Sequence, residues 1–121
     1  MFVLEEDGCI KAAAVINKTQ VDVYEGARWS FAAGDNEVCV LHTLVVDPQY
    51  AGRGLGKGFV AFYEKYALSR RCTVLRMDTN AINAAARAMY AKLGYREADI
   101  VPCVFNGIPN VNLVLLEKKL K

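Results

Sequence analysis

The sequence has no marked excess of charge of one sign and no run of basic residues. Its 121 residues carry 15 Lys and Arg against 13 Asp and Glu, which gives a formal net charge of +2. Proteins that bind nucleic acid mostly present a basic patch or stripe to the phosphates. We therefore expect no nucleic acid among the partners of this chain.

Long apolar runs are also missing. No stretch approaches the roughly 20 apolar residues of a transmembrane helix, and the first residues do not resemble a signal peptide. These absences predict a chain with no membrane partner and a cytoplasmic location. The length leaves room for one hydrophobic core and little more, so we expect a single domain over residues 1–121.

The chain is poor in the residues that hold metal ions. It has one His and four Cys, and the Cys lie far apart with no paired spacing. Zinc sites and the disulfide frameworks of small proteins draw on Cys or His at short, regular spacings. We expect no metal site, and thiols that stay reduced, at Cys9, Cys39, Cys72 and Cys103.

What the chain does have is a continuous apolar run followed by a glycine-rich stretch. Residues 38–46 are rich in β-branched side chains and apolar at odd and even positions alike, which predicts a strand covered on both faces. Pro48 cannot donate to a strand ladder and ends the run. Residues 51–58 read Ala-Gly-Arg-Gly-Leu-Gly-Lys-Gly, which predicts a tight turn and the start of a helix.

The glycine-rich stretch has the properties of an anion site. The first amides of a helix have no intrahelical partner, and the helix dipole favours negative charge beside them. Arg53 and Lys57 add positive charge there, as a bound phosphate would require. The spacing excludes a Walker loop, which needs Gly at 51 and Ser or Thr at 58, and a dinucleotide motif, which needs a third Gly at 57 or 59. A glycine-rich turn without a ligand is the alternative that the loop alone leaves open.

Two pairs of short segments predict strands at either end of the chain. Residues 1–4 and 9–17 are two apolar segments separated by a short acidic turn, which predicts a β-hairpin. Residues 96–105 and 111–116 fit a closing pair of strands about an Asn106-Gly107 turn. Residues 17–34 are mixed, with pieces that suit either a strand or a loop.

The middle of the chain alternates helix and strand. Apolar residues recur at helical spacing over 55–69, residues 73–78 predict a strand, and residues 83–92 predict a second helix. Asn83 or a neighbour caps this second helix and Gly94 ends it. Strand, helix and strand in this order imply parallel pairing through a right-handed crossover. Ligands in such units bind beyond the carboxyl ends of the strands, here near Asp78, Thr79 and Asn80.

Two segments resemble signatures of the GNAT superfamily of acyl-CoA-dependent N-acyltransferases. The first, Ala51 to Gly56, is similar to the pattern Arg or Gln, two residues, Gly, one residue, Gly or Ala, but Ala51 replaces the Arg or Gln. The second, Asn83 to Tyr95, resembles the pattern Asn, two residues, Ala, three residues, Tyr, then Leu-Gly and an aromatic residue. Members usually begin with a strand and two helices, whereas this chain opens at what resembles their second strand.

The resemblance implies an α/β (α+β) fold with a mixed, mostly antiparallel sheet, splayed central parallel strands and flanking helices. The pantetheine arm of acetyl-CoA would lie between the splayed strands, and no metal takes part. The residues that the resemblance assigns to acetyl-CoA are Leu44 and Val46 through their backbone, Gly52, Arg53, Gly54, Leu55, Gly56 and Lys57 at the pyrophosphate, and Asn83 on the second helix.

The resemblance also implies the chemistry, which is direct attack of a neutral amine on the thioester. Tyr90 matches the family tyrosine that protonates the departing thiolate. His42 lies where some branches, such as the arylalkylamine acetyltransferases, carry a catalytic histidine, and imidazole titrates near neutral pH. A partly buried His42 with only a structural role is the open alternative, as is a packing role for Tyr90.

We therefore expect an N-acetyltransferase that transfers acetyl from acetyl-CoA to a primary amine, either a small amine or a protein amino group. The alternative is a non-catalytic acyl-CoA-binding module that acts as a sensor or an assembly partner. The strand and two helices with which family members usually begin are not found here, so a face or an edge of the sheet would be left uncovered. Association of two chains would cover it, and we therefore expect a homodimer.

Overall fold

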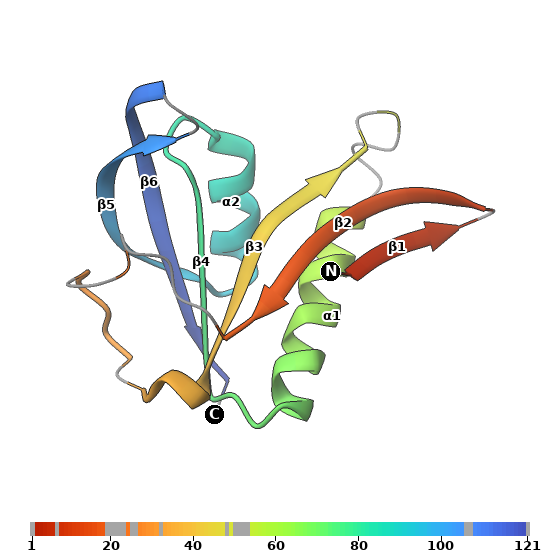
Figure 1. Ribbon diagram of the computed structural model, residues 1–121, viewed down its shortest axis with the longest axis horizontal. Helices are drawn as coiled ribbons and strands as arrows, with labels where there is room; N and C mark the ends of the chain where they lie inside the picture. The colour runs from red at the N-terminus through yellow and green to blue at the C-terminus, as the bar shows by residue number, and fades with distance from the viewer. Residues whose placement is uncertain are drawn as a thin grey trace.

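Six strands form one mixed sheet in the order β1-β2-β3-β4-β6-β5 (Figure 1). The computed structural model describes residues 2–6, 8–18, 24, 27–31, 33–47, 49, 54–105 and 108–120. The strands are β1 (Phe2–Glu6), β2 (Cys9–Asn17), β3 (Val38–Val46), β4 (Val74–Asn80), β5 (Arg96–Phe105) and β6 (Ile108–Lys119). The helices are the short 3-10 turn η2 (Asp35–Glu37), α1 (Leu55–Ser69) and α2 (Ala84–Lys92). None of the helices in the described part of the chain is long and apolar enough to cross a membrane.

The sheet confirms the expected architecture. β3 and β4 pair in parallel, and every other neighbouring pair is antiparallel. The helix predicted over residues 55–69 is α1, and the predicted second helix is α2, which Asn83 caps by accepting a 3.0 Å hydrogen bond from the Ala86 amide at Oδ1. Gly94 follows α2 with a φ of 92°, a left-handed conformation that favours glycine.

Several strand boundaries differ from the sequence-based expectation, most of all those of β4 and β6. β4 continues to Asn80 rather than ending at residue 78, because its ladder with β6 extends as far as the pair Asn80 and Leu113. β6 in turn begins at Ile108 and reaches Lys119, since it pairs with β5 on one side and β4 on the other. The predicted Pro48 stop and the Asn106-Gly107 turn lie outside the described residues.

The two parallel strands separate after a short stretch of pairing. Among the described residues, β3 pairs with β4 only from Val38 to Leu41, opposite Val74 to Met77. Beyond this point β3 follows β2 and β4 follows β6, so that the ribbon opens into a V (Figure 1).

A β-bulge lies in β3 beside the opening. Ala13 is opposite Val45 and Val15 is opposite His42, so three steps along β3 correspond to two along β2. The extra residue reverses the alternation of side chains, and Leu44 and Val46 consequently pack on the same face as Leu41.

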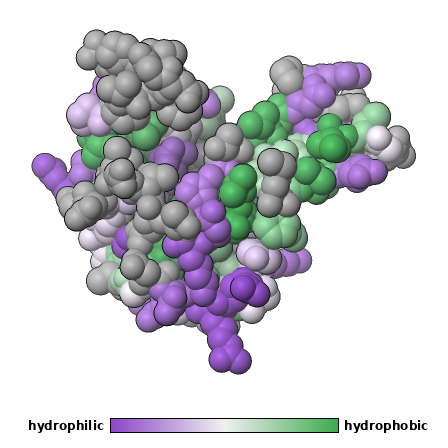
Figure 2. Space-filling model, in the orientation of Figure 1, coloured by the Kyte–Doolittle hydropathy of each residue, from purple (hydrophilic) through white to green (hydrophobic). Residues whose placement is uncertain are grey.

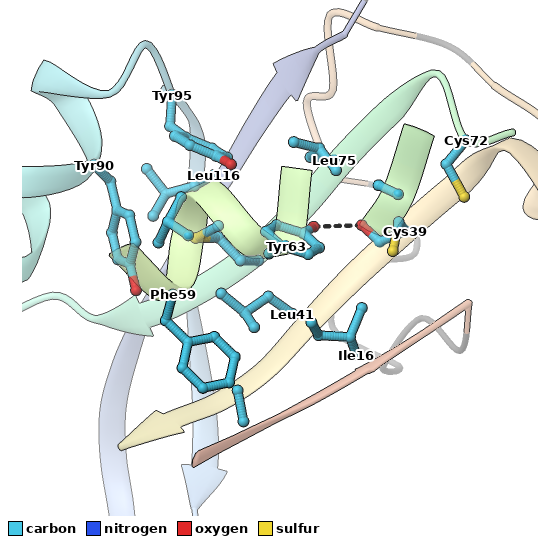
Figure 3. Packing of buried hydrophobic residues seen from close by; sticks show 14 of the residues in the cluster. Ile16, Cys39, Leu41, Phe59, Tyr63, Cys72, Leu75, Tyr90, Tyr95 and Leu116 are labelled. Atoms are coloured by element: carbon cyan, nitrogen blue, oxygen red, sulfur yellow. Dashed lines mark hydrogen bonds between the residues drawn. The ribbon is translucent and has the colours of Figure 1, made fainter. Parts of the chain in front are cut away.

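One face of the sheet packs against both helices. Figure 3 shows this main cluster, in which Tyr63 of α1 lies fully buried and donates a 2.6 Å hydrogen bond to the Cys39 carbonyl oxygen. Tyr90 and Tyr95 lie at the other end of the same cluster. The helical spacing correctly predicted Phe59 and Tyr63 of α1 as core residues, whereas Phe62, on the same helix, is 43% exposed. Cys39 and Cys72 are buried free thiols and Cys9 is an exposed one.

The opposite face of the sheet is covered by an irregular segment. We call its described residues, 24, 27–31 and 33, the strap. Tyr24, Trp29 and Phe31 of the strap pack with a second cluster of buried residues: Val38, Val40, Val74 and Leu115. Beneath the strap lie two buried charged side chains, Arg76 at 7% exposure and Glu117 at 0%. The strap thus belongs to the core, although its sequence has no regular pattern.

The arm formed by β1, β2 and β3 leaves apolar side chains in solvent. Figure 2 shows hydrophobic surface gathered over this arm. Val3 and Val45 flank Ala13 across the three strands and are 47% and 54% exposed. This row lies on the sheet face away from the main cluster, to which Phe2, Leu4 and Ala12 belong.

Candidate functional site

A cavity of about 250 Å³ lies where β3 and β4 separate. Three of its lining residues are Asp78, Thr79 and Asn80, which form the end of β4. The place expected for a ligand, beyond the carboxyl ends of the parallel strands, is therefore hollow. The remaining lining residues come from β3, β4, α2 and β6: Leu41, Leu44, Met77, Asn83, Ala86, Tyr90, Val111 and Leu113.

The cavity draws on both faces of the sheet. Tyr90 and Met77 belong to the main cluster beneath the helices. Asp78 bonds to Tyr24 of the strap, and Leu113 packs with the second cluster on the strap side. The opening between β3 and β4 therefore connects the helix side of the sheet with the strap side.

Backbone groups of β3, as well as its side chains, form one wall of the cavity. Because the described pairing of β3 with β4 ends at Leu41, the edge of β3 from His42 to Val46 that faces β4 has no ladder partner there. Its opposite edge is engaged by β2. Free amide and carbonyl groups along an apolar wall suit an extended ligand that carries amides of its own.

Tyr90 reaches the cavity from the second turn of α2. Its side chain is only 6% exposed, and its ring packs edge-on against Tyr95 with centroids 5.9 Å apart (Figure 3). Burial, and secondarily the charge of Asp78, raise the pKa of Tyr90 above its ordinary value of 10.0. The hydroxyl is protonated at physiological pH, as it would be at the ordinary pKa, and can donate a hydrogen bond to a ligand atom in the cavity.

Asn83 and Leu44 also line the cavity. Asn83 caps α2 through its side-chain oxygen, which leaves the amide NH₂ of the same side chain as a donor. Leu44 contributes an apolar side chain on the β3 wall. The structure thus brings Leu44, Asn83 and Tyr90 together, three residues that the sequence analysis proposed separately.

The N-terminus of α1 has the features of the predicted anion site. Gly54 precedes the helix with a φ of 74°, and no side chain caps the helix there. A Cβ placed on Gly56 would lie 3.6 Å from the Met89 sulfur and 3.9 Å from a Val46 methyl carbon, so this turn packs directly against α2 and the end of β3. Leu55 and Lys57 occupy the first turn of α1. Gly52 and Arg53 lie outside the described residues.

His42 is placed differently from the other candidates. It is half-buried on β3 just before the bulge, and its Nε2 lies 2.8 Å from Oδ1 of Asn17. Because an amide oxygen only accepts hydrogen bonds, the imidazole donates to it through Nε2. His42 is not among the residues that line the cavity, so its catalytic role stays a prediction.

The sequence analysis expected a ligand near Asp78 at the end of a strand, but it assigned this carboxylate no role and no partner. In the structure it is the acidic side chain among the cavity-lining residues, and its Oδ2 accepts a 2.7 Å hydrogen bond from the hydroxyl of Tyr24. Tyr24 is 54 positions away in the sequence, in the segment without a clear pattern. The signal that could have found the pair is the placement of two charged residues, Arg76 and Asp78, beside the apolar residues Val74, Leu75 and Met77 of the same strand.

Comparison with known proteins gives a family and a fold. The acetyltransferase (GNAT) family model matches residues 1–95. A ribosomal protein bS18-alanine N-acetyltransferase from Escherichia coli is 37% identical over 60 residues, which are 50% of this chain and 40% of that protein. The matches to this protein and to two other curated relatives cover 33% to 44% of their length, so the matched chain spans less than half of each.

Solved structures share the fold at low sequence identity. The crystal structure of the ribosomal-protein-S18-alanine N-acetyltransferase from Escherichia coli superimposes with a TM-score of 0.73 at 23% identity, over 98% of this chain and 67% of the other. An acetyltransferase from Salmonella typhimurium, solved with its cofactor acetyl-CoA, gives a TM-score of 0.75 at 20% identity, over 98% of this chain and 63% of the other.

Proposed function

The chain belongs to the acetyltransferase (GNAT) family, and from that premise we propose that it transfers the acetyl group of acetyl-CoA to a primary amine by direct attack. The observation that supports the proposal is the cavity at the opening between β3 and β4, which Tyr90 and Asn83 line beside the edge of β3 that has no described ladder partner. A tyrosine hydroxyl can protonate a thiolate leaving group, and backbone amides can stabilise the oxyanion that forms during attack on a thioester.

Acetyl-CoA fits the described residues in three places. The N-terminus of α1, open at Gly54 and bearing Lys57, suits the pyrophosphate, and the proposal extends this site to Gly52 and Arg53. The edge of β3 at Leu44 and Val46 suits the amides of the pantetheine arm. Asn83 offers its amide donor from the start of α2. Bound there, acetyl-CoA supplies the activated acetyl group.

Within the cavity we assign separate roles to two groups. Tyr90, whose hydroxyl is protonated at physiological pH, donates its proton to the departing sulfur as general acid. Asp78 lies on the strap side and receives the acceptor amine, because a carboxylate both attracts an ammonium group and accepts hydrogen bonds from it. His42 remains the candidate for removing the amine proton, and it is tested by His42→Gln against the wild type.

The acceptor is proposed to be an amino group, on a small molecule or a protein. The chain's similarity to ribosomal protein alanine N-acetyltransferases supports a peptide that begins with alanine as the first acceptor to try. The exposed apolar row Val3, Ala13 and Val45 supports the proposal of a homodimer, because burying it would remove apolar surface from water.

The test is thiol release from acetyl-CoA in the presence of an amine panel: an alanine-initiated peptide, a lysine-containing peptide, a polyamine and an arylalkylamine. We expect at least one amine to be acetylated, and Tyr90→Phe to reduce kcat by roughly a hundredfold. Tyr95→Phe is the matched control, since it keeps its ring against Tyr90 and loses only a hydroxyl that donates to Glu64. Tight binding of acetyl-CoA without transfer to any amine would favour the non-catalytic alternative.

A further inference from the structure

Asp78 is held in place from outside the cavity. Its Oδ2 accepts the hydroxyl proton of Tyr24 at 2.7 Å, while Asp78 itself lines the cavity. Tyr24 does not line the cavity and is only 2% exposed. The contact therefore joins a carboxylate of the candidate site to a buried side chain behind it.

The ring of Tyr24 is fixed independently of this contact. Trp29 packs edge-on against it with centroids 5.3 Å apart, and the Trp29 indole N–H donates to the Tyr24 carbonyl oxygen at 2.9 Å. Arg76, two residues before Asp78 on β4, places its guanidinium carbon 4.3 Å from the centre of the Trp29 ring. The Tyr24 hydroxyl is thus presented to Asp78 by a packed assembly and not by a free side chain.

The assembly is anchored to the sheet further along the strap. Glu117 of β6 accepts hydrogen bonds from the backbone amides of Ser30 and Phe31 at 2.9 to 3.1 Å, and Arg76 donates to the Phe31 carbonyl oxygen at 3.1 Å. Burial and the neighbouring Asp78 charge raise the pKa of Tyr24, so its hydroxyl stays protonated and remains a donor.

We propose that Tyr24 is a positioning residue, whose hydroxyl engages Oδ2 of Asp78 and thereby turns Oδ1 toward the acceptor amine in the cavity. A carboxylate whose two oxygens have different partners has one orientation, and a single orientation lowers the cost of bringing the amine to the thioester. The inference rests on the proposed function, in which Asp78 receives the acceptor. It extends the site to the strap, whose sequence carries no motif.

The test is a double-mutant cycle with Tyr24→Phe and Asp78→Asn, measured with the panel amine that the wild type acetylates fastest. Tyr24→Phe keeps the ring against Trp29 and removes only the hydroxyl. We expect kcat/KM for the amine to fall roughly tenfold in Tyr24→Phe, while the acetyl-CoA concentration that half-saturates a thermal shift stays the same. In the Asp78→Asn background the same substitution should change kcat/KM less than twofold.

Tyr95→Phe is the matched control, because Tyr95 is also a buried tyrosine whose hydroxyl donates to a carboxylate, that of Glu64 at 2.9 Å. It should leave kcat/KM for the amine unchanged. An equal loss from Tyr24→Phe in both backgrounds, or a loss no greater than that of Tyr95→Phe, would overturn the proposal, because either result describes a purely structural tyrosine.

Crystal structures of the wild type and Tyr24→Phe supply a readout that does not need turnover. The Asp78 carboxylate should change orientation or occupy two conformers in the variant, and an unchanged single orientation would overturn the proposal. If the wild type binds acetyl-CoA but acetylates no amine, the proposed function fails, whereas this structural comparison still decides whether Tyr24 orients Asp78.

Discussion

Replacing Glu117 by glutamine should destabilise the protein far more than the size of the change suggests. Glu117 is the fully buried carboxylate of β6 that the strap covers. It accepts from the amides of Ser30 and Phe31, and it pairs with Arg96 through an ion pair between the Arg96 Nη1 and its own Oε2. Arg76 lies directly across from it on β4. Glutamine retains the shape of the side chain and removes its charge.

The magnitude follows from the groups that lose a partner. Glutamine has one acceptor oxygen, so an amide of the strap that now bonds to Glu117 would face an NH₂ donor, at a cost of about 1–3 kcal/mol. The bonds that remain lose their charge assistance, which costs about 1 kcal/mol more. Arg76, 7% exposed, also loses the negative charge of its register partner on β6. We expect the free energy of unfolding to fall by about 3 kcal/mol.

Glu97→Gln is the matched control. Glu97 forms an ion pair with Arg87 at 2.8 Å, and the two side chains are 35% and 32% exposed. Exposed pairs of this kind contribute only about 0.5 kcal/mol, because solvent screens them. The same chemical substitution should therefore cost several times less at position 97 than at position 117.

Urea unfolding followed by two probes measures both effects. The single tryptophan, Trp29, lies in the strap and reports its attachment by fluorescence, while far-UV circular dichroism reports the sheet and helices. In Glu117→Gln we expect the fluorescence midpoint to fall at least as far as the circular dichroism midpoint. A free energy of unfolding for Glu117→Gln within about 0.5 kcal/mol of that for Glu97→Gln would refute the reasoning that buried charge holds the strap.

The remaining predictions concern the site and the helices. Tyr90→Phe should lower kcat by roughly a hundredfold and leave acetyl-CoA binding intact, measured by steady-state kinetics beside a thermal-shift titration; equal kcat at every pH would exclude the general-acid role. Gly58→Ala, in an open helical position, should raise stability by about 0.5–1 kcal/mol in urea unfolding, whereas Gly54→Ala at a φ of 74° should lower it by about 1 kcal/mol. The hydrogen bond from Arg87 lowers the pKa of Glu97 from its ordinary value of 4.5. The stability from this pair is therefore present above pH 4.5 and is lost as the pH falls through the lowered pKa, so urea midpoints of Glu97→Gln and the wild type should converge in acid; a constant gap would contradict this.

Much of the fold could be predicted because local pattern and tertiary structure agree. The apolar run 38–46 became the central strand, and helical periodicity over 55–69 gave α1 with the same bounds. Asn83 and Gly94 marked the ends of α2 because capping and left-handed conformations depend on the residue itself. The glycine-rich stretch likewise placed Gly54 at the start of α1, where a positive φ is needed.

The strap and its buried charges could not be predicted in this way. Tyr24 contacts Asp78 at a sequence separation of 54 residues, and Ser30 contacts Glu117 at a separation of 87. No local periodicity in the sequence can therefore indicate either contact. The bulge in β3 depends on the register with β2, which is a property of two strands and not of one. A charged residue inside an apolar strand, such as Arg76 or Glu117, is the sequence signal that a covering segment must supply partners.

The most direct test of the account is a thermal-shift titration with acetyl-CoA. A ligand that binds only the folded protein stabilises it by about 2.7 kcal/mol at a hundred times its Kd, which for a domain of this size corresponds to a rise in Tm of roughly 10 °C. The account predicts a saturable rise in the wild type and in Gly58→Ala, and a much weaker one in Gly54→Val, where a β-branched side chain would occupy a φ of 74° at the start of α1. A folded wild type whose Tm does not move with acetyl-CoA would contradict it.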